Sequence, residues 1–209
     1  MKRLTAILAT LVMLTGIASP TASAYCRENN FYRTGCVNGF YSKYGVIVVN
    51  TGTDILCIRL LYNADYDDLL PAAQSNRKTY SAYISEILKL TNKMRSEKGL
   101  PALKLSEKLT EQACVRAEEV AWSGIHGHTR PGNKSYTTLF IENGYESGAV
   151  GENLGENFDS ASDVCKAWKN SESHYNNILS KRYTDIGIGV AVDPASPDGF
   201  VFVQHFYGK

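Results

Sequence analysis

The strongest constraint on the fold of this chain lies near its C-terminal end, where two runs of strand-forming residues follow each other closely. Residues 186–192 read IGIGVAV, residues 200–206 read FVFVQHF, and the turn-rich segment DPASPDG separates them. Apolar, β-branched and aromatic runs bounded by proline, aspartate and glycine are typical of paired strands. The pattern therefore predicts an antiparallel hairpin.

Helical periodicity characterises much of the chain before this hairpin. From Tyr80 onward, apolar residues recur at steps of three and four positions until Gly99 and Pro101 supply a stop signal. A second helix is predicted over residues 107–122, with Ser106 as its cap.

A third helix is predicted to begin at Ser160. Asp163 follows three positions later, as in a capping box, and an apolar stripe continues to Trp168. Helices combined with a strand hairpin predict an α+β domain over residues 80–209.

The N-terminus resembles a cleaved secretory signal peptide. Lys2 and Arg3 precede an apolar run over residues 4–17, and an A-x-A site ends at Ala24. The run is about 14 residues long, whereas a membrane span needs about 20. Cys26 lacks the flanking small residues of a lipoprotein site. We therefore expect a protein without a membrane span, secreted and either extracellular or associated with the cell wall.

Residues 25–70 are predicted to form a small β-rich module, because YGVIVV and ILCIRLL read as strands broken by turn residues. A core of this size is marginal, so Cys26, Cys36 and Cys57 are predicted to staple it with disulfides. The polar residues 71–79 show no periodicity and are predicted to be a linker.

Composition excludes several classes of protein. The 209 residues are 44% hydrophobic and 21% charged, as in ordinary globular proteins and unlike disordered or fibrous chains. The formal net charge of +1 gives no basic excess, so nucleic acid is not an expected partner.

Two further cysteines lie on predicted apolar helix faces. Cys114 shares a face with Ala117, and Cys165 lies beside Val164. Export to an oxidising compartment favours a disulfide between Cys114 and Cys165. The alternative is two buried free thiols that act as small hydrophobic groups.

The candidate functional residues are histidines and a glutamate. His126 and His128 follow the second helix, His174 follows the third, and Glu152 lies between them in a G-E-N sequence. Imidazole and carboxylate groups suit proton transfer and metal binding if the fold brings them together. The H-E-x-x-H, G-x-S-x-G and phosphate-loop signatures are absent from the sequence. The residues alone indicate a secreted α+β domain with a candidate pocket of His and Glu.

A series of short motifs, taken in order, resembles a bacterial CAP domain, also called SCP, of the superfamily of cysteine-rich secretory proteins, antigen 5 and pathogenesis-related group 1 proteins. The resemblance spans residues 84–206. Its motifs are LTNKMR (90–95), GLPAL (99–103), HTRPG (128–132), NGY (143–145), GENL (151–154), WKNSESHYNNIL (168–179), IGIGV (186–190) and QHF (204–206). The resemblance implies an α-β-α sandwich with a cleft of two histidines and acidic residues, which holds a divalent metal in several members.

Carried over by position, the resemblance assigns His128, Glu152 and His174 to the cleft and to a weakly bound, zinc-like divalent cation. The resemblance places Ser171 at the fourth position of the cleft, where many eukaryotic members have a glutamate three residues after the tryptophan. His126 has no counterpart in the family and His205 occupies a variable place in the final strand, so neither is interpreted as part of the site and both are interpreted as bystanders.

The leading hypothesis is a non-enzymatic extracellular binding module that uses this cleft. Its ligand would be a lipid, a peptide or a cell-surface component. One alternative is a metal-dependent, peptidase-like hydrolase that uses the same cleft, since a metal with an open position activates water. The other is an adhesive or structural surface protein that acts through the Tyr-rich module.

Overall fold

The structure, a computed structural model, describes residues 46–50, 55–59, 66–123, 125–192 and 199–209. The chain divides into two compact units, Met1–Tyr62 and Asn63–Lys209, and each is described by itself. The predicted signal peptide, Cys26, Cys36 and the side chain of Cys57 lie outside the described residues. Within the described ranges, no helix is both long and apolar enough to cross a membrane.

The first unit contains a two-stranded antiparallel sheet. Strand β1 (Val46–Asn50) pairs with β2 (Ile55–Arg59), and Val48 lies opposite Cys57. β2 falls within the run ILCIRLL, and β1 covers the end of YGVIVV and the following Asn50, so the strand prediction for this part of the module is confirmed.

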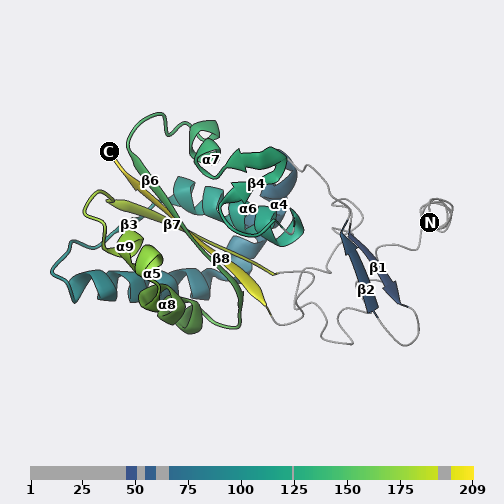
Figure 1. The fold of residues 1–209 in the computed structure, drawn as a ribbon, viewed down its shortest axis with the longest axis horizontal. Helices are drawn as coiled ribbons and strands as arrows, with labels where there is room; N and C mark the ends of the chain where they lie inside the picture. The colour runs from purple at the N-terminus through teal and green to yellow at the C-terminus, as the bar shows by residue number, and fades with distance from the viewer. Residues whose placement is uncertain (1–45, 51–54, 60–65, 124, 193–198) are drawn as a thin grey trace. The chain divides into compact units, whose positions relative to one another are not determined.

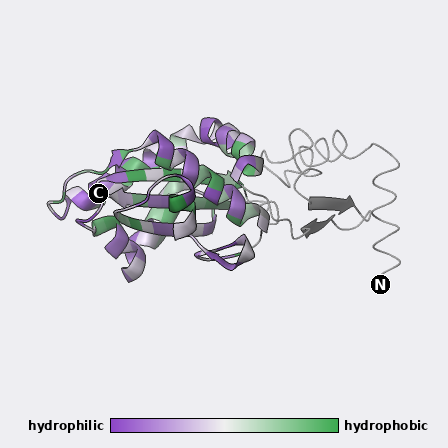
Figure 2. Cartoon of the chain, turned by 90° about the horizontal axis from the view of Figure 1, so that it is seen from above, coloured by the Kyte–Doolittle hydropathy of each residue, from purple (hydrophilic) through white to green (hydrophobic). Residues whose placement is uncertain are grey.

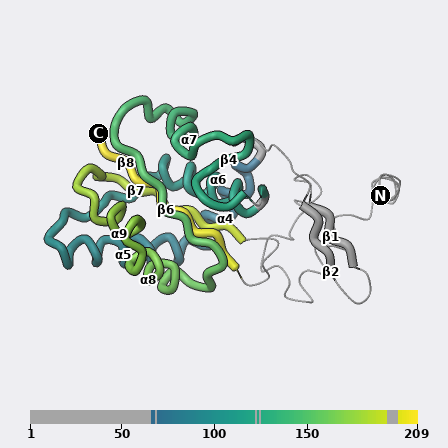
Figure 3. Tube along the Cα trace, in the orientation of Figure 1, coloured from purple at the N-terminus to yellow at the C-terminus, as the bar shows by residue number. Residues whose placement is uncertain are grey.

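A four-stranded sheet in the order β3-β7-β8-β6 forms the centre of the second unit. β7 (Asp185–Val192) and β8 (Phe200–Gly208) form the predicted antiparallel hairpin. β6 (Ala149–Phe158) pairs antiparallel with the other side of β8, and the short β3 (Lys104–Leu105) pairs parallel with β7. Figure 3 traces how β6 runs beside the β7–β8 hairpin although two helices separate it from the hairpin in the sequence.

Helices cover both faces of this sheet and give the α-β-α sandwich that the resemblance implies (Figure 1). The helices α5 (Ser81–Ser96), α8 (Ala161–Asn170) and α9 (Glu172–Leu179) lie on one face, and α4 (Tyr66–Thr79) and α6 (Glu107–Ser123) lie on the other. The segment between α6 and β6 contains β4 (Thr129–Arg130), a 3₁₀ turn (Pro131–Asn133), β5 (Lys134–Ser135) and α7 (Thr137–Glu142).

The three predicted helices are confirmed as α5, α6 and α8. The apolar stripe of α8 is buried, and Ser160 caps its first turn because the backbone N–H of Asp163 donates to Ser160 Oγ at 3.1 Å. Hydrophobic residues gather where helices meet the sheet, and polar residues lie on the outer helix surfaces (Figure 2).

Glycine sets how closely α6 approaches the sheet. A Cβ built on Gly187 would lie 2.1 Å from the carbonyl oxygen of Leu109, and one on Gly189 would lie 2.0 Å from that of Ala113. The missing side chains in the run IGIGV therefore let the helix backbone rest directly on β7. A Cβ on Gly155 would instead meet the side chain of Val164, which comes from α8 on the other face.

The edge of the sheet formed by β6 has side-chain partners for its outward carbonyl groups. Tyr183 Oη donates to the carbonyl oxygen of Val150 at 3.1 Å, and Asn177 Nδ2 donates to that of Glu152 at 3.2 Å. The indole N–H of Trp168 donates to the carbonyl oxygen of Leu154 at 2.9 Å. Three alternate carbonyls along this edge are therefore hydrogen-bonded.

The predicted linker at residues 71–79 is wrong, because this segment lies inside α4. Leu69 and Ala73 are buried one helical turn apart. The polar residues that suggested a linker instead contact α6, where Gln74 bonds Glu111 and Asn76 bonds Glu118. The helix was missed because its buried stripe begins before Pro71, in residues assigned to the preceding module.

The predicted disulfide between Cys114 and Cys165 is also wrong, because both thiols are free and buried. Cys114 belongs to α6 and Cys165 to α8, on opposite faces of the sheet. Burial raises the pKa of each thiol to about 12, so both behave as small apolar groups. Helical periodicity predicted their burial but carried no information about which face each helix covers.

Gly189→Ala is expected to destabilise the protein by about 1–3 kcal/mol, because its methyl group would press against helix backbone that cannot step aside. The matched control is Gly155→Ala, whose methyl group would meet the side chains of Val164 and Phe158 and no helix backbone. Urea unfolding of both variants measures the difference. An equal or larger loss in Gly155→Ala would contradict the close approach of α6.

Candidate functional site

The G-E-N sequence on β6 directs two polar side chains to opposite faces of the sheet. Glu152 lies beside His205 of β8 on the α6 face, and Asn153 lies beside Gln204 on the α5 face. Successive residues of a strand point to alternate faces, so a single motif supplies both layers. The candidate site lies around Glu152.

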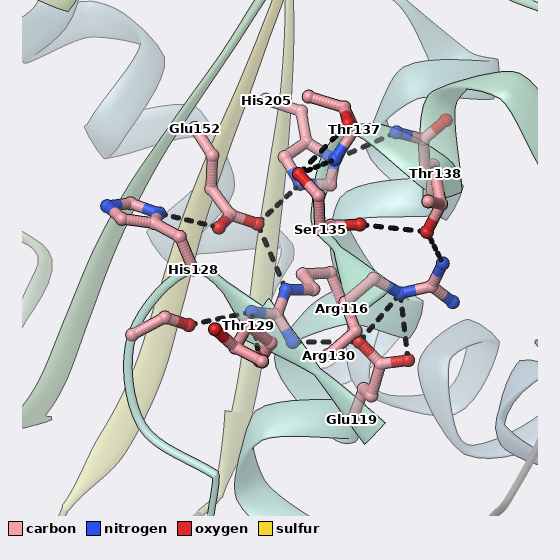
Figure 4. Close-up of polar contacts among 12 residues, drawn as sticks. Arg116, Glu119, His128, Thr129, Arg130, Ser135, Thr137, Thr138, Glu152 and His205 are labelled. Carbon is pink, nitrogen blue, oxygen red and sulfur yellow. Dashed lines mark hydrogen bonds and ion pairs between the residues drawn. The ribbon is translucent and has the colours of Figure 1, made fainter. Parts of the chain in front are cut away.

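Glu152 is a buried carboxylate with three donors (Figure 4). His128 Nδ1 lies 2.8 Å from Oε1, while Arg116 Nε and His205 Nε2 each lie 3.0 Å from Oε2. Burial alone would raise the pKa of Glu152. Hydrogen bonds from the two histidines and the Arg116 charge outweigh burial and lower its pKa to about 2.

The imidazole of His128 is held by a hydrogen bond at one nitrogen and is still accessible to solvent. Its Nδ1 faces Glu152, yet about half of the side chain is exposed to solvent. The Tyr136 ring lies 5.6 Å from the imidazole, centroid to centroid, and the Tyr136 N–H donates to the His128 carbonyl oxygen at 3.1 Å. Since Nδ1–H donates to Glu152, the Nε2 lone pair remains for a ligand.

His174 approaches the same place from α9. Burial and the charge of His128 lower the pKa of His174, so the two imidazoles are close enough to interact electrostatically. Asn153 Nδ2 donates to the His174 carbonyl oxygen at 3.1 Å and holds α9 against β6. The structure therefore places His128 against Glu152 and His174 on α9, which Asn153 holds beside β6; that the three side chains share a cleft stays a prediction.

Ser171 ends α8 and begins α9, and its hydroxyl lies 3.3 Å from the Ser173 hydroxyl. Within the described ranges, none of the hydrogen bonds given for Ser171 joins it to His128, Glu152 or His174. Its predicted place in the cleft rests on the resemblance.

The interpretation of His205 as a bystander is wrong. His205 is completely buried; Gln112 Nε2 donates to its Nδ1 at 3.1 Å, so its Nε2–H donates to Glu152. Burial lowers the pKa of His205 and favours the neutral ring. A histidine inside a strand run as apolar as FVFVQHF needs a buried partner, and this was the signal that could have identified it.

His126, the other predicted bystander, lies at the surface. Its Nδ1 contacts Glu156, the residue on β6 four positions after Glu152. Its side chain is 65% exposed, so it belongs to the rim and not to the buried network.

In the described part of the chain, no group of three or more His, Cys, Asp or Glu side chains is arranged to hold a metal ion. Both oxygens of Glu152 already accept hydrogen bonds. The geometry gives Glu152 the role of orienting His128, in place of the direct ligand that the resemblance implies.

Acid sensitivity is expected to depend on Glu152. A carboxyl whose pKa falls from 4.5 unfolded to about 2 folded stabilises the protein above pH 4.5, and this contribution is lost as pH falls toward 2. Between pH 4.5 and pH 3, the wild-type protein should lose on the order of 2 kcal/mol more stability than Glu152→Gln. Urea unfolding across this range tests the difference. Glu156→Gln is the control and should follow the wild-type slope; a wild-type slope in Glu152→Gln would contradict the assignment.

The sequence of this chain is similar to that of a protein from Bacillus subtilis. The chain is 31% identical over 129 residues to the uncharacterized protein YkwD of Bacillus subtilis, a match that covers 62% of this chain and 48% of that protein. The chain thus spans about half the length of this relative.

Two solved structures share the fold. An extracellular protein with an SCP domain from Bacillus anthracis superimposes with a TM-score of 0.56 at 22% identity, covering 75% of this chain and 47% of that one. An outer surface protein of Borrelia burgdorferi gives a TM-score of 0.55 at 17% identity, covering 61% of this chain and 93% of that one.

The model of the cysteine-rich secretory protein family, CAP, matches residues 88–206, which include β6, β7, α9 and every cleft residue described above. This match extends over more than half of the chain. The protein belongs to the cysteine-rich secretory protein (CAP) family.

Proposed function

We propose that this protein is a secreted, non-enzymatic binding module whose cleft recognises an extracellular ligand through His128 and His174 and can hold a divalent cation. The observation that carries the proposal is the contact of His128 Nδ1 with the buried Glu152, at 2.8 Å, on a half-exposed imidazole. A carboxylate behind one ring nitrogen fixes the tautomer and makes the other nitrogen a better ligand.

The donor set fits a weakly held cation. Two neutral imidazoles supply the nitrogen ligands that zinc-like ions accept, and the lowered pKa of His174 keeps its ring neutral near neutral pH. Glu152 already has three donors, so water would complete the coordination. Two protein ligands bind a metal less tightly than the four of a closed structural site.

An extracellular role is supported by two independent lines. The N-terminal sequence has the features of a cleaved signal peptide. Relatives of the same fold include an extracellular protein and an outer surface protein. The ligand that the proposal envisages is a lipid, a peptide or a cell-surface component.

Zinc titration by calorimetry tests the cation site. Weak binding is expected at pH 7.5, and affinity about tenfold lower or more at pH 5.5, because protonated imidazole has no lone pair and ordinary imidazoles charge below about pH 6.5. His174→Ala should reduce the affinity at pH 7.5 by a similar factor.

His126→Ala is the matched control, since His126 pairs with Glu156 at the rim. It should leave zinc binding unchanged. Equal affinity at the two pH values, or binding that survives His174→Ala and disappears in His126→Ala, would place the metal outside the proposed cleft.

A further inference from the structure

Arg116, a residue of α6 that the sequence analysis did not single out, lies completely buried beneath the cleft. Its guanidinium has four partners (Figure 4). Nε donates to Glu152 Oε2 at 3.0 Å, and Nη1 donates to Glu119 Oε2 at 2.7 Å. Nη2 lies 2.8 Å from the carbonyl oxygen of Gly127 and 3.4 Å from that of Thr129.

These partners surround one residue. Gly127 and Thr129 are the chain neighbours of His128, and Glu152 is the carboxylate that its Nδ1 faces. One planar group thus contacts the backbone on both sides of His128 and also the acceptor of its side chain. A guanidinium holds such an arrangement rigidly because its donors project in a fixed fork.

We propose that Arg116 is the positioning residue of the cleft: by fixing the backbone around His128 and the carboxylate behind it together, it determines which imidazole nitrogen His128 presents to a ligand. Without this contact, Glu152 would keep its hydrogen bond with His205 but would lose the one partner that also binds the backbone on both sides of His128. With the contact, the distance between the carboxylate and the His128 backbone is set by a single group.

Arg116 is itself held by a chain of alternating charges. Glu119 accepts from Arg116 and also from Arg130 Nε, which lies 3.1 Å from each of its oxygens. Arg130 Nη1 continues the chain to Glu142 of α7 at 2.9 Å. The fork of Arg116 therefore cannot turn away from Glu152 without breaking a buried ion pair.

Buried ion pairs seldom add net stability, because desolvation of the charges offsets their attraction. The arrangement is better explained by the geometry that it imposes. Lysine could supply the same charge at position 116, but its donors all lie on one nitrogen and cannot reach the four partners that the three guanidinium nitrogens contact.

The inference rests on the proposed cleft, but its test needs no metal. The tautomer of His128 is read from its ¹⁵N chemical shifts by NMR at pH 7.5, in the metal-free protein. In the wild type, the proton should reside mainly on Nδ1. In Arg116→Lys, we expect a substantial share of the population to move to the Nε2–H form, and zinc affinity to fall about 10–100-fold.

Arg95→Lys is the matched control. Arg95 is also buried, and it donates to the carbonyl oxygens of Pro101, Ile178 and Ser180, each at 2.8 Å, beside α5 and α9. Its loss should destabilise the fold without changing the His128 tautomer. An unchanged Nδ1–H population in folded Arg116→Lys, or an equal shift in Arg95→Lys, would overturn the proposal.

If Arg116→Lys does not fold, the wild-type protein still provides a test. Couplings across the hydrogen bonds should connect Arg116 Nε with the Glu152 carboxyl carbon and Nη2 with the Gly127 carbonyl carbon. Their absence when the Arg116 signals are resolved would equally overturn it. A tautomer that responds as expected while zinc fails to bind would instead refute the proposed cation site and leave the role of Arg116 intact.

Discussion

The architecture of the domain depends on the burial of β8 from both sides. Seven of its first eight residues are buried, and only Tyr207 is partly exposed within that stretch. Any polar side chain on such a strand needs a partner inside the protein. Gln204 and His205 are adjacent, so they point to opposite faces, and each starts a separate network.

On the α5 face, Gln204 connects Thr91 to Asn153. On the α6 face, His205 connects Gln112 to Glu152. The two networks join at β6, where Glu152 and Asn153 are consecutive. The positions of these two polar networks thus follow from strand alternation applied to two neighbouring strands in register.

Local patterns were sufficient for one hairpin and three helices of the second unit, whereas α4, β6, α7 and α9 were not predicted from them. The hairpin and three helices were predicted because each presents an uninterrupted apolar period or a clear cap, as Ser160 does with Asp163. α4 was missed because only Leu69 and Ala73 identify its buried side, and Pro71 lies between them. The disulfide prediction failed because periodicity identifies a buried face without saying what covers it.

Local patterns also predicted only part of the candidate site. His128, Glu152 and His174 were identified through the motifs that carry the family resemblance, although they lie in a loop, a strand and a helix. Arg116 and His205 interrupt apolar patterns, and their importance depends on partners 36 and 53 positions away. Pairing over such distances is a property of the sheet register, and no local sequence window contains it.

The hydrogen bonds to the outward carbonyl groups of β6 also affect how the protein can associate with other chains. Exposed strand edges present free backbone groups to which another polypeptide chain can add, and this is a common route to aggregation. Here Tyr183, Asn177 and Trp168 already occupy three alternate carbonyls of that edge. An incoming strand would have to displace all three side chains, so this side of the sheet is protected from the addition of further copies of the chain.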